Sequence, residues 1–119
     1  MRLWMARVLV AAAVCLFLGT AFRAGWTQIS TDFPNYYTAA VAARQRKPLR
    51  NYYDWTWFAR QMNYAGVEQQ IGAWTPQTPV TMLPMAAIAG LAPMTAKRVW
   101  LVCNLALLAA TLWMLARGT

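Results

Sequence analysis

Residues 8–22 read VLVAAAVCLFLGTAF and carry no charged side chain. The apolar stretch extends back to Leu3 if the aliphatic stem of Arg7 lies along the helix and its guanidinium reaches the interface. Because a helix needs about 20 residues to cross a bilayer, we expect a first transmembrane span at residues 3–22. A cleaved secretory signal has the same order of basic and apolar residues. However, Ala21-Phe22-Arg23-Ala24 offers no small-x-small cleavage site.

Two further apolar stretches follow a polar insert. Residues 99–116 are eighteen residues interrupted only by Asn104 and Thr111, which predicts another span. The stretch before it, residues 80–93, is short: a helix between Pro79 and Pro93 is only about 20 Å long, against a core of about 30 Å. This short span either begins earlier or re-enters the membrane, and the sequence leaves both open.

The composition places the chain among membrane proteins. Its 119 residues are 60% hydrophobic and 12% charged, with seven Trp. We therefore expect an all-α integral membrane fold, a single region 1–119 with about three transmembrane helices and a large loop, residues 23–79, between the first two. The chain has no His, CxxC or HExxH, so the sequence predicts no metal and no cofactor. Cys15 and Cys103 lie within apolar runs and are interpreted as packing residues.

The loop has the residue pattern of two helices. Pro34 suits the first turn of a helix that continues to Ala43 and that Lys47-Pro48 ends. Asp54 can cap a second helix, 55–63, which Ala65-Gly66 ends. The aromatic face of this second helix predicts a position in the membrane interface.

Basic residues near the span ends predict the orientation. Arg2, Arg7, Lys97 and Arg98 fall on one side of the three expected spans, and the loop has only Arg23 close to a span. This predicts a multi-pass protein of the cell membrane with a cytoplasmic N-terminus and an extracytoplasmic loop 23–79. A count over the whole loop weakens the inference, because five more cations lie there.

The chain has a net charge of +8, and its densest group of cations lies in the loop: Arg44, Arg46, Lys47 and Arg50. Nucleic acid fits poorly beside lipid-soluble flanks. Membrane lipids, through their anionic headgroups, or a phosphate-bearing lipid substrate are therefore the expected partners.

The order of these pieces resembles the N-terminal part of glycosyltransferase family 87, the polyprenol-phosphate-mannose-dependent mannosyltransferases. The matching residues are Asp32-Phe33-Pro34-Asn35-Tyr36-Tyr37-Thr38-Ala39-Ala40, Tyr53-Asp54, Pro76 to Pro84, Pro93, and Trp100 to Asn104. They span nearly all of this chain but about the first third of such an enzyme. The chain departs from the family in the turn, where Arg46-Lys47-Pro48 replaces a motif with Gly, and in lacking an adjacent Pro-Pro.

The resemblance implies a fragment of a GT-C fold that takes a hexose, mannose, from a polyprenyl-phosphate-sugar donor to a lipid or glycan acceptor. Asp32 is the position that fits the catalytic carboxylate, a general base toward the attacking hydroxyl. Tyr36 and Tyr37 are candidates for sugar stacking. The basic cluster is the candidate for the donor phosphate. We expect the fragment alone to be inactive.

Each of these assignments has a structural alternative. Asp32 and Asp54 can act as helix caps, with Asp54 the stronger case. The tyrosines can form an interfacial belt. The whole chain can also be a small non-enzymatic membrane protein whose basic, aromatic loop binds anionic lipid or a partner subunit.

Overall fold

The computed structural model describes residues 3–29, 32–67, 72, 74 and 78–118, and every regular element among them is helical. The predicted all-α class is therefore confirmed for this part of the chain. The elements in chain order are α1 (Leu3–Phe17), the π-helical turn η1 (Leu18–Phe22), α2 (Arg23–Thr27), α3 (Phe33–Arg44), the 3₁₀ turn η2 (Leu49–Tyr53), α4 (Trp55–Tyr64), the 3₁₀ turn η3 (Pro79–Met82), α5 (Leu83–Ala86) and α6 (Pro93–Gly118).

Two helices are long and apolar enough to cross a membrane. The first, Trp4–Thr27, combines most of α1 with η1 and α2 in one rod, and the second is α6. Their apolar windows are unburied, unlike the core helix of a soluble protein. An N-terminal apolar helix is also typical of a signal sequence, so α6 contributes more to the membrane assignment.

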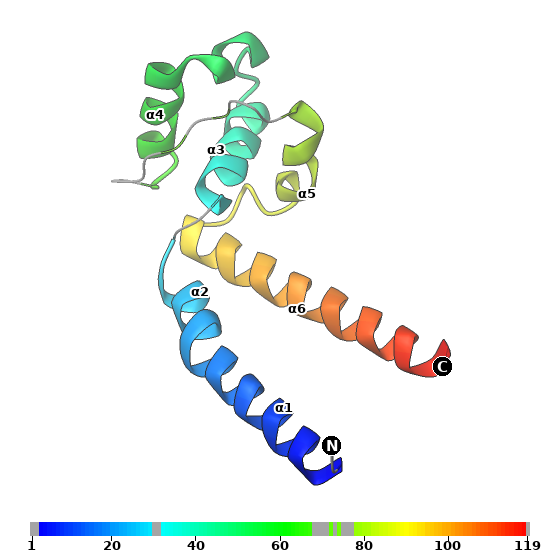
Figure 1. Ribbon diagram of the computed structural model, residues 1–119. Coiled ribbons are helices and arrows are strands. Elements are labelled where there is room, and N and C mark those ends of the chain that lie inside the picture. Colours follow the sequence, from blue (N-terminus) through cyan, green and yellow to red (C-terminus); the bar gives the residue numbers. More distant parts are fainter. Residues whose placement is uncertain (1–2, 30–31, 68–71, 73, 75–77, 119) are drawn as a thin grey trace.

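The two long helices lie side by side where the insert joins them and diverge toward the chain ends (Figure 1). The ammonium of Lys97 donates to the carbonyl of Gln28, and Nε of Arg98 donates to the carbonyl of Trp26. Both basic residues therefore lie at the insert end of the first helix. The sequence interpretation, which put them on the side of Arg7, is corrected by these contacts.

The stretch predicted as a short span, residues 80–93, does not form a membrane-length helix. Its residues are divided among η3, the four-residue α5, a turn and the first residue of α6. Met82, Met85 and Ala89 are buried in the core of the insert, and the segment packs against α3. Prolines explain the interruption: Pro79 and Pro84 begin short helical turns, and Pro93 starts the next helix.

Helix α3 is the centre of the insert, with α4 and α5 packed against it (Figure 1). Its buried Ala39, Ala40 and Ala42 are small, which allows neighbouring segments to approach closely. Phe58 and Met62 of α4 are also fully buried. The helix predicted to lie in the interface therefore packs one face into the core of the insert, while its first and last residues, Trp55 and Tyr64, remain 62% and 77% exposed.

The ends of α3 and α4 share one geometry. The Val67 N–H bonds to the Met62 carbonyl, and Gly66, at φ 76°, provides the left-handed residue that ends α4 as predicted. At the end of α3 the Lys47 N–H bonds to the Ala42 carbonyl. There the left-handed position, at φ 56°, is occupied by Arg46. A side chain is strained in this conformation, which explains why glycine suits that turn.

Candidate functional site

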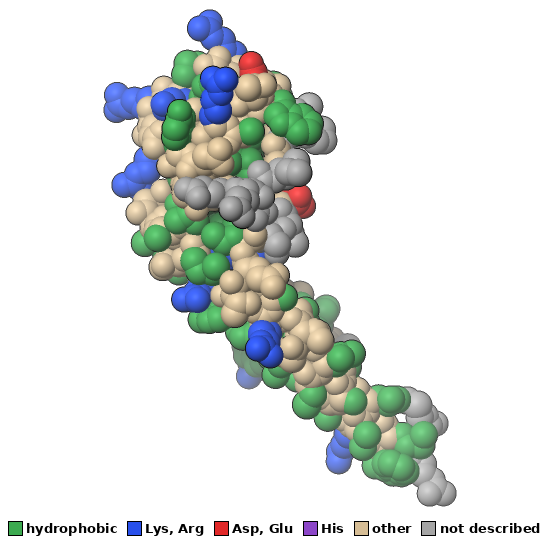
Figure 2. Space-filling view, turned by 90° about the vertical axis from the view of Figure 1, so that its left-hand side faces the viewer, with side chains coloured by type: hydrophobic (Ala, Val, Ile, Leu, Met, Phe, Trp, Pro, Cys, Tyr) green, Lys and Arg blue, Asp and Glu red, His purple; other side chains and the backbone are tan. Residues whose placement is uncertain are grey.

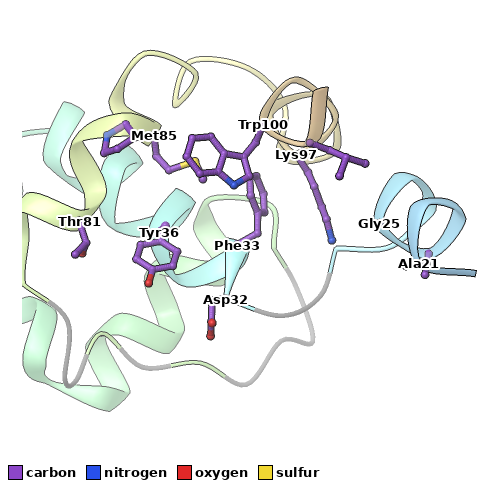
Figure 3. Close-up of a pocket in the computed structure, with 12 residues that line it drawn as sticks. Ala21, Gly25, Asp32, Phe33, Tyr36, Thr81, Met85, Lys97 and Trp100 are labelled. Carbon is purple, nitrogen blue, oxygen red and sulfur yellow. The ribbon is translucent and has the colours of Figure 1, made fainter. Parts of the chain in front are cut away.

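A pocket of about 620 Å³ lies where the insert meets the two long helices. Its walls come from the end of the first helix, the start of α3, η3, α5 and the first three turns of α6 (Figure 3). Most of the lining is apolar, including Gly25, Met85 and Leu101. Asp32 and Lys97 are the charged residues in this lining.

Asp32 is placed by the start of α3. Its backbone carbonyl accepts from the N–H groups of Asn35 and Tyr36, so the main chain has entered the helix at this residue. Its side chain makes no capping hydrogen bond and is exposed. The capping alternative for Asp32 is therefore not realised by the carboxylate, which is directed away from the Met85 and Trp100 side of the pocket in Figure 3.

Asp54, unlike Asp32, caps its helix through its side chain. Its Oδ1 accepts from the Trp57 N–H at 2.9 Å, the geometry of a helix N-cap. The predicted cap is thus confirmed for Asp54. The two aspartates have different roles in the structure although both precede a helix.

Aromatic rings form one wall of the pocket. Tyr36 is half-buried and its ring meets Trp74 edge-on, with the centroids 6.1 Å apart. Trp100 extends over the pocket from α6 (Figure 3). Sugars bind to flat aromatic faces, so Tyr36 is in a suitable place for the stacking role that the resemblance implies.

Tyr37 lies elsewhere. It is 3% exposed, stacks on Phe33 with the ring centroids 5.6 Å apart, and donates its hydroxyl to the Leu91 carbonyl at 2.7 Å. Burial raises the pKa of this hydroxyl above its ordinary value. The structure therefore makes Tyr37 a core residue that joins α3 to the segment before α6.

The basic cluster is at the other end of α3 from Asp32. Twelve helical residues separate the two ends, a rise of about 18 Å. The four side chains are exposed: Arg44, Arg46, Lys47 and Arg50. Basic residues gather at the end of the insert away from the long helices (Figure 2). This cluster does not share the pocket with Asp32.

Lys97 is the cation that the structure brings to the pocket, and the sequence interpretation missed it. It is 7% exposed, and its ammonium donates to the Gln28 carbonyl. The sequence signal was a lysine one turn after the proline that begins an apolar helix. The assumed short span at residues 80–93 hid it, because that span placed Lys97 on the membrane face opposite the loop.

The pocket thus combines a carboxylate, an ammonium, a tyrosine and an apolar lining. A carboxylate can accept a proton from a hydroxyl group, and an ammonium can stabilise an anion. Within the described residues there is no group of three or more metal-ligating side chains. Cys15 and Cys103 are free thiols on the exposed faces of the long helices.

No family model matches this chain, and no curated protein or solved structure is significantly similar to it. The likeness to glycosyltransferase family 87 therefore depends on the order of the sequence pieces alone.

Proposed function

We propose that this chain is the N-terminal part of an integral membrane glycosyltransferase. The enzyme moves a hexose, mannose, from a polyprenyl-phosphate donor to a lipid or glycan acceptor. The observation that carries the proposal is Asp32: an exposed carboxylate without a capping bond, on a pocket where two apolar helices meet the insert.

The proposed transfer requires one general base, which takes the proton of the acceptor hydroxyl. The carboxylate of Asp32 takes the proton of the acceptor hydroxyl while the hydroxyl oxygen attacks the anomeric carbon. The bond between that carbon and the phosphate oxygen breaks, and the phosphate leaves on the polyprenyl chain with both bonding electrons. The products are a glycoside, a polyprenyl phosphate and a protonated Asp32.

The pocket has suitable surroundings for both substrates. Its apolar lining at the ends of the long helices fits an isoprenoid chain next to the headgroup. Tyr36 offers an aromatic face to a hexose. A cation can stabilise the leaving phosphate, so the reaction requires no metal.

The orientation in this proposal comes from the resemblance, which implies that the insert faces the extracytoplasmic side of the cell membrane. The distribution of basic residues does not support this orientation over the opposite one. Lys97 and Arg98 lie with Arg23 at the insert end, while Arg7 and Arg117 lie toward the other end, so the two ends are similarly basic.

A second candidate function is a non-enzymatic membrane protein whose insert binds a partner subunit or anionic lipid. The basic cluster favours it, because four cations gather on an exposed end of the insert, remote from the pocket. In this second function the carboxylate of Asp32 takes no part in catalysis.

A transfer assay tests the proposal. Membranes containing the chain in its complete reading frame are supplied with radiolabelled mannosyl phosphoryl polyprenol or with a labelled nucleotide mannose. We expect label in the acceptor from the lipid donor without added divalent metal, and in the presence of EDTA. Transfer from neither donor, with the protein correctly inserted, would contradict the enzyme and leave the binding function.

A further inference from the structure

We infer that Lys97 binds the phosphate of an anionic lipid whose chain lies between the first long helix and α6. The identity of this lipid as a polyprenyl phosphate rests on the proposed function. It replaces Arg44, Arg46, Lys47 and Arg50 as the phosphate site.

The first observation is that the buried charge of Lys97 has a neutral hydrogen-bond partner. Its side chain is 7% exposed, and its recorded partner among the described residues is one neutral carbonyl, that of Gln28. An ammonium has three N–H donors, so two remain for other acceptors. A buried cation is costly without a counter-charge, and a phosphate supplies both charge and acceptors.

The second observation is where this charge lies. Lys97 lines the same pocket as Ala21, Gly25 and Leu101, which come from the two apolar helices. In Figure 3 its side chain extends from α6 beside Phe33, with its ammonium on the side of Gly25 and Ala21. The cation is thus placed where the apolar helices end, the level at which a lipid headgroup begins.

The third observation is the apolar surface of the two long helices next to the pocket. Gly25 of α2 lies opposite Leu101 of α6, and a Cβ at position 25 would meet the Leu101 side chain at 3.5 Å, an ordinary van der Waals contact. Toward the chain ends the two helices diverge (Figure 1). Both helices also carry exposed apolar side chains beyond the pocket, such as Val14 and Leu108. An isoprenoid chain therefore has an apolar surface to follow from the pocket, with its phosphate at Lys97 and its sugar toward Asp32 and Tyr36.

Arg98 provides the comparison. It donates to the Trp26 carbonyl at 3.3 Å, and its guanidinium lies 5.2 Å from the centre of the Trp26 ring. It is exposed and is absent from the pocket lining. Arg98 therefore stabilises the helix pair, whereas Lys97 also faces the pocket.

Binding of farnesyl phosphate and of farnesol to the chain in a neutral detergent tests the inference. The two probes share one isoprenoid chain and differ only in the phosphate. We expect the wild type to bind farnesyl phosphate about tenfold or more tightly than farnesol. Lys97→Met should abolish this preference and keep the affinity for farnesol. Lys97→Arg should retain part of the preference.

Arg60→Met is the matched control, since Arg60 is an exposed cation of α4 outside the pocket, and it should behave as wild type. A Lys97→Met protein that keeps the preference, or a Lys47→Met protein that loses it, would overturn the inference.

If Lys97→Met fails to fold, the wild type is photolabelled with a diazirine analogue of farnesyl phosphate, and the position of the label tests the site. Label on peptides with Ala21 or Leu101 supports the site, and label confined elsewhere refutes it. A chain that binds farnesyl phosphate through Lys97 but transfers no sugar would refute the proposed function only.

Discussion

The ammonium of Lys97 donates to the main-chain carbonyl of Gln28 at 2.5 Å, although the two residues are 69 positions apart. Arg98 makes the parallel contact with Trp26. Cations at the end of a helix stabilise its free carbonyls and its partial negative charge. These two contacts therefore join the start of α6 to the end of α2 and close the insert as a loop between two helices.

Cysteine accessibility checks this arrangement. In a chain with Cys15 and Cys103 replaced by alanine, we expect Lys47→Cys and Arg98→Cys to react with a membrane-impermeant maleimide from the same side. Arg117→Cys should react from the other side, because α6 runs from the insert toward the chain end. Three spans would instead separate the labels at positions 47 and 98.

Arg46→Gly should stabilise the insert. Arg46 has a φ of 56°, a conformation that side chains disfavour and glycine adopts readily. We expect a gain of about 1 kcal/mol in the free energy of unfolding, measured by thermal denaturation in detergent. The reverse test is Gly66→Ala at φ 76°, which should lose a similar amount. No change in either variant would mean that the two turns differ from those described.

The two aspartates should differ in their effect on stability. Asp54→Ala removes the cap of α4 and should cost about 1 kcal/mol. Asp32→Ala should leave the unfolding temperature nearly unchanged, because its carboxylate makes no capping bond. Equal losses in the two variants would show that Asp32 also caps its helix.

Tyr37→Phe should destabilise the insert by about 1 kcal/mol, since it removes the buried bond from the tyrosine hydroxyl to Leu91. Tyr64→Phe is the control, at a residue that is 77% exposed, and should have little effect. Unfolding of both variants and the wild type is followed by near-ultraviolet circular dichroism.

The same tyrosine predicts a pH dependence. Burial raises the pKa of Tyr37 in the folded chain above its ordinary value of about 10. The folded state then holds its proton more tightly than the unfolded state, so this contribution to stability is present below pH 10 and is lost as the pH rises through the folded pKa. We expect the difference between wild type and Tyr37→Phe to narrow in alkaline solution. A constant difference would indicate an unshifted pKa.

Local patterns in the sequence predicted local structure well. The cap at Asp54, the end of α4 at Gly66 and the long apolar helices were readable, because each depends on residues a few positions apart. The segment 80–93 was misread as a span, since its apolar residues serve the core of the insert and composition does not distinguish lipid from protein surroundings.

The site was harder to predict because it depends on contacts between distant residues. Asp32 and Tyr36 were found from their motif, and both line the pocket. Tyr37, one residue further along α3, points into the core, as helical geometry turns adjacent side chains about 100° apart. Lys97 reaches the pocket only through the packing of α6 on α2.

The central claim is that Asp32 is the base of a sugar transfer. Its most direct test compares Asp32→Asn with Asp54→Asn in the complete protein, by the rate of mannose transfer from mannosyl phosphoryl polyprenol. Asparagine keeps the size and capping ability of aspartate but cannot take the proton. We expect Asp32→Asn to lower the rate by about 10²-fold or more with normal insertion in the membrane, and Asp54→Asn to keep it. An Asp32→Asn protein that transfers mannose at the wild-type rate would contradict the account.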